Sequence, residues 1–148
     1  MRAVVQRVTS ATVKVDGETR GTIGAGLMVL IGVGREDTGE DAAFMADRIV
    51  GMRIFADSDS KMNLALGPAE GAMLIVSQFT LMADTSHGRR PSFTAAAAPD
   101  DARRLYRAFI DAVRRTGIHT EEGEFGATME VELVNDGPVT IMIDSKSR

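Results

Sequence analysis

A continuous apolar run at residues 27–33 places the strongest constraint on how this chain can fold. Glycines stand on both sides of the run, at Gly26 and Gly34. A run without polar residues is typical of a strand that is buried on both faces, so other elements must cover each side of it. The run is far shorter than the roughly 20 residues that cross a bilayer. It therefore predicts a central strand of a globular domain.

The rest of the chain predicts further strands and two helices. Six stretches have the alternating or apolar pattern of strands: 2–8, 12–15, 19–23, 73–76, 129–134 and 139–143. A further strand is expected to start at His119. A turn is expected near Ser10, and Asp16-Gly17 predicts a hairpin. One helix should start near Thr38 and another after Pro99, because apolar residues recur at helical spacing in the residues that follow. Hairpin-like connections dominate, which favours an α+β fold over a doubly wound sheet.

Composition limits the chemistry that is open to the chain. Its 148 residues fit one domain with a core of ordinary depth. Cysteine is absent, which excludes disulfides, thiolate nucleophiles and cysteine-ligated metals. With only two histidines, His87 and His119, no metal and no cofactor are expected. The first residues lack the apolar segment of a signal peptide, so we expect a soluble cytoplasmic protein and no membrane partner.

The formal net charge of -4 argues weakly against a general nucleic-acid binder. The charge is unevenly distributed, however, because residues 84–115 contain seven arginines against four aspartates and no other charged residue. Arg89 and Arg90 stand side by side in this segment and could neutralise phosphates, although a solvated loop explains them equally well. A local basic face on an acidic body is therefore possible.

A polar motif, Ser77-Gln78-Phe79-Thr80-Leu81, directly follows the apolar stretch 73–76. At the end of a strand, hydroxyl and amide groups can converge at the rim of an apolar pocket. They can equally satisfy backbone groups at the strand end, and the pattern alone leaves both readings open. The usual nucleophile, metal and phosphate-loop motifs are missing from the chain.

A second motif, Asn135-Asp136-Gly137-Pro138, separates the last two predicted strands. A plain turn is the default interpretation. Glycine permits unusual backbone angles, and a bond that precedes proline can be cis, although only about 5–6% of such bonds are cis in folded proteins. A rigid turn of this kind could direct backbone carbonyls outward, where they would accept hydrogen bonds from the ammonium group of a ligand.

Taken together, these stretches resemble the D-aminoacyl-tRNA deacylases of the Gly-cisPro type. The matching segments are 1–8, 30–33, 61–64, 77–81, 88–93, 123–127 and 135–140. The resemblance implies one domain over residues 1–148, with an antiparallel or mixed, barrel-like sheet and two main helices. It also implies a cytoplasmic homodimer that hydrolyses the ester between a D-amino acid, or glycine, and the terminal adenosine of tRNA.

The resemblance also implies roles for individual residues. Gly137 and Pro138 would enter the active site of the opposite subunit, face the α-ammonium group of the substrate and leave no room for an L side chain. Arg7 would hold the orientation of this motif. The residues implied around the ester and the adenosine are Ser77, Gln78 and Thr80 as the catalytic group, and Phe79, Phe125 and Met129 as the pocket lining.

In this family the ribose 2′-hydroxyl of the tRNA is thought to assist the attacking water, and no protein nucleophile is obligatory. Thr80 is the best side-chain candidate if a nucleophile exists. Two other functions stay open. One is a non-catalytic nucleic-acid-binding module that uses Arg89, Arg90 and the second helix, and the other is a hydrolase of small esters that uses Thr80 or Ser77.

Overall fold

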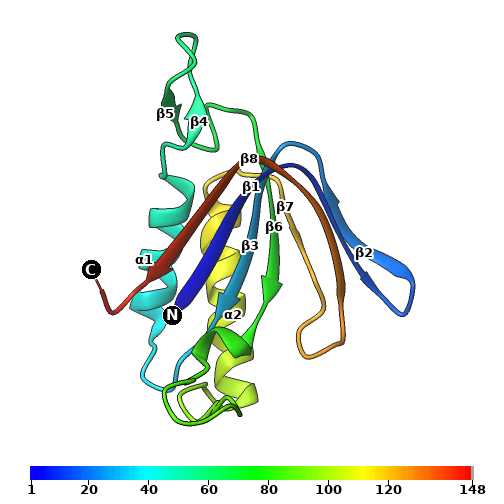
Figure 1. The fold of residues 1–148 in the computed structure, drawn as a ribbon. Coiled ribbons are helices and arrows are strands. Elements are labelled where there is room, and N and C mark those ends of the chain that lie inside the picture. Colours follow the sequence, from blue (N-terminus) through cyan, green and yellow to red (C-terminus); the bar gives the residue numbers. More distant parts are fainter. Residues whose placement is uncertain (148) are drawn as a thin grey trace.

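Two long strands, β1 (Arg2–Val15) and β8 (Glu130–Asp144), run antiparallel along each other through the centre of the molecule (Figure 1). On its other edge, β1 pairs with β3 (Gly26–Gly32) through its first half and with β2 (Glu18–Ile23) through its second half. The structure is a computed structural model and describes residues 1–147. The central strand predicted from the apolar run is β3.

The sheet is mixed and nearly closed on itself. β6 (Ala72–Ser77) and β7 (Thr120–Glu122) continue from β3 as parallel strands. β2 then approaches them from the other side, and a Cβ atom on Gly21 of β2 would lie 3.1 Å from both Glu122 O and Leu74 Cδ1. The arrangement is barrel-like, and the predicted α+β class is confirmed.

Two helices, α1 (Gly39–Val50) and α2 (Pro99–Arg115), cover one face of the sheet (Figure 1). Both begin where the sequence predicts. The Thr38 backbone N–H donates to the Asp41 carboxylate at 2.8 Å and closes the first turn of α1. α2 starts at Pro99, whose missing N–H is not needed at that position. Neither helix of the described chain is long and apolar enough to cross a membrane.

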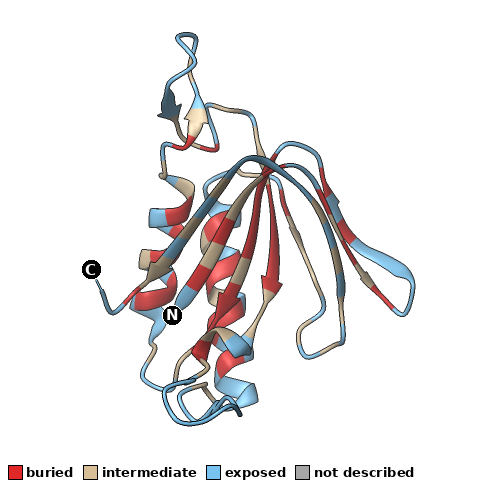
Figure 2. Ribbon diagram, viewed as in Figure 1, coloured by how far each residue is buried: buried red, intermediate tan, exposed pale blue. Residues whose placement is uncertain are grey.

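The core explains the unbroken apolar character of β3. Leu27, Val29 and Ile31 lie beneath the two helices and are almost fully buried. Met28, on the opposite face, packs with Leu74 and other residues of a second cluster inside the curved sheet. Figure 2 shows this burial concentrated on β1, β3, β6 and the inner sides of the helices. Burial of both faces of β3 is therefore confirmed.

Two boundaries predicted from sequence are wrong. The stretches 2–8 and 12–15 form the single strand β1, because the irregularity between Gln6 and Ser10 is taken up as register shifts against β8 and not as a turn. The stretches 129–134 and 139–143 are likewise one strand, β8, in which residues 136–139 bulge. A bulge adds residues to one strand without ending the pairing, so the local sequence resembles a turn.

Three short elements have no counterpart in the sequence prediction. β4 (Phe55–Ala56) and β5 (Met62–Leu64) form a small hairpin that projects from the end of α1 (Figure 1). η1 (Phe79–Met82) is a 3₁₀ helix that begins two residues after β6 ends. η1 contains part of the Ser77–Leu81 motif and so decides how that motif is presented.

A buried cluster of charges joins the start of β1 to the end of β8. The Met1 amino group lies 2.6 Å from Asp37 Oδ1 and donates to Ser145 Oγ at 2.6 Å. Lys146 Nζ donates to Asp41 Oδ2 at 2.9 Å and lies 3.5 Å from Asp37 Oδ1. Both carboxylates are buried, so each depends on these cations for compensation.

This cluster should make the protein sensitive to acid. Burial by itself raises the pKa of the Asp41 carboxyl, but hydrogen bonds from Lys146, Thr38 and Ser145 outweigh it and hold the pKa well below the ordinary 3.8. The unfolded chain therefore binds a proton that the folded chain does not, and stability present above pH 3.8 is lost as the pH falls. Urea unfolding between about pH 3 and 7 should show this loss. The loss of stability with falling pH should be smaller in Asp41→Asn. If the free energy of unfolding fell equally steeply with pH in both proteins, Asp41 would not be the group responsible.

Candidate active site

The Ser77–Leu81 motif lies at the carboxyl end of β6, where the chain leaves the sheet. Ser77 is the last paired residue and faces Ile31 in the register, and the Gln78 N–H donates to Ile31 O at 2.8 Å. Gly32 permits this turn, since a Cβ atom there would lie 2.6 Å from Gln78 O. The parallel pairing and one close backbone approach therefore fix where the motif begins.

Beyond Gln78, the motif presents the side chains of Phe79 and Thr80 to solvent. The Gln78 amide donates a hydrogen bond to Thr80 Oγ1. The Phe79 side chain is 58% exposed and meets Phe93 edge to face, with ring centroids 5.2 Å apart. Within residues 1–147, no histidine or carboxylate hydrogen-bonds to the hydroxyl of Ser77 or Thr80. The motif thus forms a polar and aromatic surface without an activated nucleophile of the usual kind.

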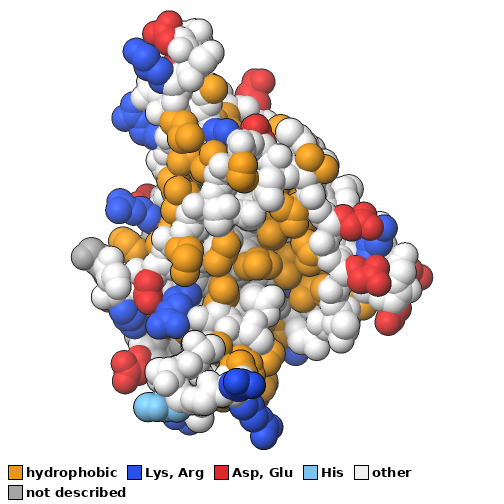
Figure 3. Space-filling model, in the orientation of Figure 1, with side chains coloured by type: hydrophobic (Ala, Val, Ile, Leu, Met, Phe, Trp, Pro, Cys, Tyr) orange, Lys and Arg blue, Asp and Glu red, His pale blue; other side chains and the backbone are white. Residues whose placement is uncertain are grey.

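Arg89 and Arg90 belong to a loop beside this surface. Asp84 and Ser92 exchange backbone hydrogen bonds of 2.8 and 2.9 Å, which close the loop at its base. Phe93, directly after the loop, contacts Phe79 and brings the two segments together. Both arginines are exposed, and neither has an ion pair within the described part of the chain. Figure 3 shows Lys and Arg side chains at this end of the molecule, whereas Asp and Glu predominate at the β1–β2 hairpin.

Phe125 and Met129 flank the end of β6 on its two sides. The segment passes close to β6, because the Gly123 N–H donates to Ile75 O at 2.9 Å. Phe125 packs on the helix side, with its ring centroid 5.6 Å from that of Tyr106 and 4.8 Å from the Arg103 guanidinium carbon. Met129 packs in the cluster inside the curved sheet. Both side chains are partly buried.

Gly137 and Pro138 lie in the bulge of β8 and are exposed. The peptide bond between them is cis, and Gly137 has a φ of 120°. Arg7 contacts the bulge from β1, donating from Nε to Asp136 O at 3.2 Å with Asp136 Oδ2 at 3.3 Å. The other end of the guanidinium donates to Ile54 O at 2.5 Å. Arg7 therefore connects the bulge to the segment after α1.

Within one chain, the bulge and the Ser77–Leu81 motif are far apart. Ser77 is level with Ile31 and, one strand further, with Ala3 of β1. Arg7 lies four residues further along β1, a distance of about 13 Å at the usual rise of a strand. The bulge is also about three strand spacings, roughly 14 Å, from β6 across the sheet. A single chain brings the motif, the arginine loop, Phe125 and Met129 to the end of β6, but not Gly137 and Pro138.

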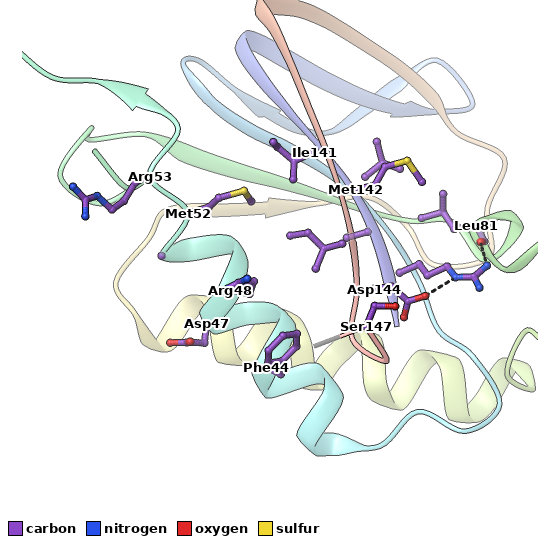
Figure 4. A pocket seen from close by; sticks show the side chains of 15 residues that line it. Phe44, Asp47, Arg48, Met52, Arg53, Leu81, Ile141, Met142, Asp144 and Ser147 are labelled. Carbon is purple, nitrogen blue, oxygen red and sulfur yellow. Dashed lines mark hydrogen bonds and ion pairs between the residues drawn. The ribbon is translucent and has the colours of Figure 1, made fainter. Parts of the chain in front are cut away.

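A groove of considerable size lies elsewhere on the described surface. It has a volume of about 1040 Å³ and runs along the flank of β8, lined by side chains from β8, β1 and α1 (Figure 4). Of the Ser77–Leu81 motif, only Leu81 reaches it, and none of the predicted site residues lines it. Met142, on its rim, is 81% exposed. The sequence analysis did not predict this groove. The apolar residue Met142 in β8 was the one feature of the sequence that could have indicated it.

Sequence reasoning also assigned no role to two residues that contact each other next to the bulge. Gln6 Nε2 donates to Asn135 Oδ1 at 3.0 Å. Gln6 is next to Arg7 in β1, and Asn135 is next to Asp136 in β8. Adjacent residues of one strand contact adjacent residues of the strand that pairs with it, so the sequence positions alone could have indicated this contact.

Known proteins share both the sequence and the fold of this chain. A D-aminoacyl-tRNA deacylase of Geobacter sulfurreducens is 55% identical over 148 residues, covering all of this chain and 97% of the relative. One from Bacillus licheniformis is 56% identical over 147 residues, covering 99% of this chain and all of the relative. A solved structure of a c-Myc DNA unwinding element binding protein superposes with a TM-score of 0.92 at 38% identity, covering 97% of this chain and 98% of its own.

A further solved structure, of a probable eukaryotic D-amino acid tRNA deacylase, has the same fold, with a TM-score of 0.84 at 21% identity and 96% of this chain covered. The fold and these matches define an enzyme of the deacylase class, a group of hydrolases. The model of the D-Tyr-tRNA(Tyr) deacylase family matches residues 4–144, and the chain belongs to this family. The predicted family and enzyme class are confirmed.

Proposed function

We propose that the chain hydrolyses the ester bond between a D-amino acid and the 3′-terminal adenosine of tRNA, releasing both in free form. The observation that carries this proposal is the exposed Gly137–Pro138 bulge in a chain that matches the deacylase family over residues 4–144. The proposal places the enzyme in the cytoplasm, where aminoacyl-tRNA is made and used.

Chirality is set by rejection in this proposal. Carbonyl groups of the exposed bulge accept hydrogen bonds from the α-ammonium group, and the side chain of an L-amino acid then collides with the bulge. A site that excludes one enantiomer by collision does not need to recognise the side chain of the other. Many D-amino acids are therefore substrates, and glycine, which has no side chain to collide, is also released from tRNA.

The active unit in this proposal is a homodimer. The distance between the bulge and Ser77 within one chain supports it, because a second copy is needed to bring Gly137 and Pro138 to the end of β6. Two large apolar side chains of β8, Val134 and Met142, are 56% and 81% exposed, and contact with a second copy would remove apolar surface of this kind from water. Figure 3 shows apolar side chains gathered over the centre of the sheet, on the face away from the helices.

Catalysis in this proposal rests on positioning and on stabilisation of the oxyanion. Water attacks the ester carbonyl carbon, the bond to the ribose oxygen breaks, and that oxygen receives a proton. The neighbouring 2′-hydroxyl of the tRNA assists the water. Ser77, Gln78 and Thr80 supply hydrogen bonds around the ester, and Phe79, Phe125 and Met129 line the pocket. An aminoacyl ester is already activated, so these effects supply much of the required acceleration.

Replacement of Thr80 by valine tests this mechanism. Because no histidine or carboxylate of the described residues hydrogen-bonds to its hydroxyl, we expect kcat to fall by less than about tenfold, the usual effect of one neutral hydrogen bond. A D-tyrosyl-tRNA that ends in 2′-deoxyadenosine should instead react at least about a hundredfold more slowly, the range for a lost proton-transfer catalyst. Single-turnover rates measure both effects. Complete loss of activity in Thr80→Val, with the deoxy substrate unaffected, would make Thr80 the nucleophile.

The direct test of the proposed function uses matched D-tyrosyl-, L-tyrosyl- and glycyl-tRNA. We expect the D-tyrosyl and glycyl esters to be cleared at catalytic enzyme concentrations and the L-tyrosyl ester to persist. Turnover of small D-amino acid esters at a comparable rate would favour the small-ester hydrolase that uses Ser77 or Thr80. A requirement for the tRNA would exclude that alternative.

One observation favours a second function, a nucleic-acid-binding module that uses Arg89 and Arg90. The neighbour at 38% identity is described as a DNA unwinding element binding protein. Such a module would bind unacylated RNA or DNA in a salt-sensitive manner and would release no amino acid. If catalytic concentrations of the protein hydrolyse D-tyrosyl-tRNA, a function in binding alone is excluded.

Arg89 and Arg90 are the proposed phosphate contacts with tRNA. The double substitution to alanine should weaken tRNA binding and flatten its dependence on salt by about 1.5 units of log–log slope, since each lost contact removes roughly 0.7–0.9. The ratio of D- to L-tyrosyl-tRNA rates should stay unchanged. Binding titrations at several salt concentrations measure the slope. Lys14→Ala is the control, because Lys14 lies in the part of β1 that pairs with β2. A changed ratio would place the pair inside the pocket.

A further inference from the structure

Two consecutive residues of β1 contact two consecutive residues of β8 next to the Gly137–Pro138 bulge. Gln6 Nε2 donates to Asn135 Oδ1 at 3.0 Å, and Arg7 Nε donates to Asp136 O at 3.2 Å. Successive side chains of a strand point to opposite faces, so the two contacts lie on opposite sides of the sheet. The chain entering the bulge is therefore held from both sides.

The strand pairing makes such contacts necessary. Gln6 is paired with Thr140 and Val8 with Asn135, so four residues, 136–139, stand opposite Arg7 alone. A bulge leaves its extra residues outside the regular ladder of backbone hydrogen bonds. The orientation of the bulge therefore depends on side chains at its base, and the described contacts there come from Gln6 and Arg7.

Gln6 is also an unfavourable residue for stability alone. Its Oε1 atom is buried and has no hydrogen-bond partner among the described residues. A buried acceptor without a partner is unfavourable, and an apolar side chain of the same length would avoid it. The contact that glutamine provides and methionine cannot is the one with Asn135.

We propose that Gln6 is a positioning residue for the bulge. By holding Asn135 on the face opposite Arg7, it fixes the direction of the Gly137 and Pro138 carbonyls and with it the discrimination between D and L substrates. This inference rests on the proposed function for its effect on chirality, but the holding of Asn135 can be tested without any substrate.

The experiment compares Gln6→Met, Asn135→Ala, the double variant and Gln6→Glu. Gln6→Met keeps the length of the side chain and removes the contact, whereas in Gln6→Glu a carboxylate can accept from the Asn135 amide and restore it. Lys14→Met is the matched control, since it removes another side-chain link between β1 and β8, the 3.1 Å contact of Lys14 Nζ with Glu132 Oε1. Amide hydrogen exchange over residues 134–140, urea unfolding and rates on D- and L-tyrosyl-tRNA are measured for each variant.

In Gln6→Met we expect exchange over 134–140 to accelerate at least tenfold, with a urea midpoint equal to or above that of the unmodified chain. The ratio of the rates on D- and L-tyrosyl-tRNA should fall at least tenfold, and the change should lie in kcat more than in KM. In exchange and in the rate ratio, Asn135→Ala should behave like Gln6→Met, and the double variant should be no worse than either. In the same two measurements, Gln6→Glu and Lys14→Met should match the unmodified chain. Non-additivity of this kind identifies two residues that act through one contact.

The two ways of failing are distinct. Unchanged exchange in Gln6→Met would overturn the positioning role, as would accelerated exchange with an unchanged D to L ratio. If the unmodified chain hydrolyses no D-tyrosyl-tRNA, the proposed function fails, and the exchange comparison still decides whether Gln6 holds the bulge.

Discussion

Replacement of Gly137 by alanine should lower the rate of D-tyrosyl-tRNA hydrolysis at least about a hundredfold while the chain stays folded. Gly137 has a φ of 120°, a region that side chains of L-residues rarely adopt. A Cβ atom there would lie 3.0 Å from Val139 Cγ2, 3.1 Å from Val139 N and 3.2 Å from Arg7 Nη2. The backbone must shift to relieve these contacts, and a shift of about 1 Å in a reacting geometry can reduce a rate about a hundredfold.

Single-turnover hydrolysis measures this loss, and urea unfolding separates it from a loss of folding. Gly17→Ala is the matched control, because Gly17 has a φ of 78° in the β1–β2 turn and no atom beyond its adjacent residues lies within 4 Å of its Cβ position. Both variants introduce backbone strain of about 1–3 kcal/mol, but only Gly137→Ala disturbs the bulge. Equal activity in the two variants would show that the bulge does not contribute to hydrolysis.

Replacement of Asp37 by alanine should destabilise the chain by about 3–5 kcal/mol, the usual result of removing one partner from a buried ion pair. The Asp37 side chain is 2% exposed and the Met1 amino group is fully buried, at 2.6 Å from it. Without the carboxylate, the ammonium group keeps its hydrogen bond to Ser145 but loses its compensating charge.

Urea unfolding at neutral pH measures the loss. The control is Asp101→Ala, which removes an exposed pair with Arg104 on α2 and should cost less than about 1 kcal/mol. The difference between the two variants isolates burial as the cause. A destabilisation of Asp37→Ala no larger than that of Asp101→Ala would mean that water reaches the Met1 amino group.

The sequence predicted those parts of the fold that depend on local chemistry. The apolar run at 27–33 was enough to identify a strand buried on both faces, and Thr38 and Pro99 mark the starts of the two helices. The breaks expected at Ser10 and at residues 135–138 were wrong as boundaries. Whether an irregular stretch is a turn or a bulge depends on the strand that pairs with it, and that partner is distant in the sequence.

The candidate site shows the same division. The motifs named the residues, and the pairing of β6 with β3 brings Ser77 to the end of the sheet where Phe125 and the arginine loop also lie. Gly137 stands opposite Arg7 and far from Ser77. This position follows only from the register of β1 with β8. Register is a property of the whole sheet, so no motif could give this separation.

The separation of Gly137 from Ser77 has a consequence for the newly made chain. On the proposed arrangement, a single chain carries both the surface that hydrolyses and the element that rejects L substrates, but the two never meet until a second copy binds. A lone chain therefore has no complete site with which to attack the abundant L-aminoacyl-tRNA around it. Assembly then acts as a safeguard, because hydrolytic capacity and the means to restrain it arise in the same event.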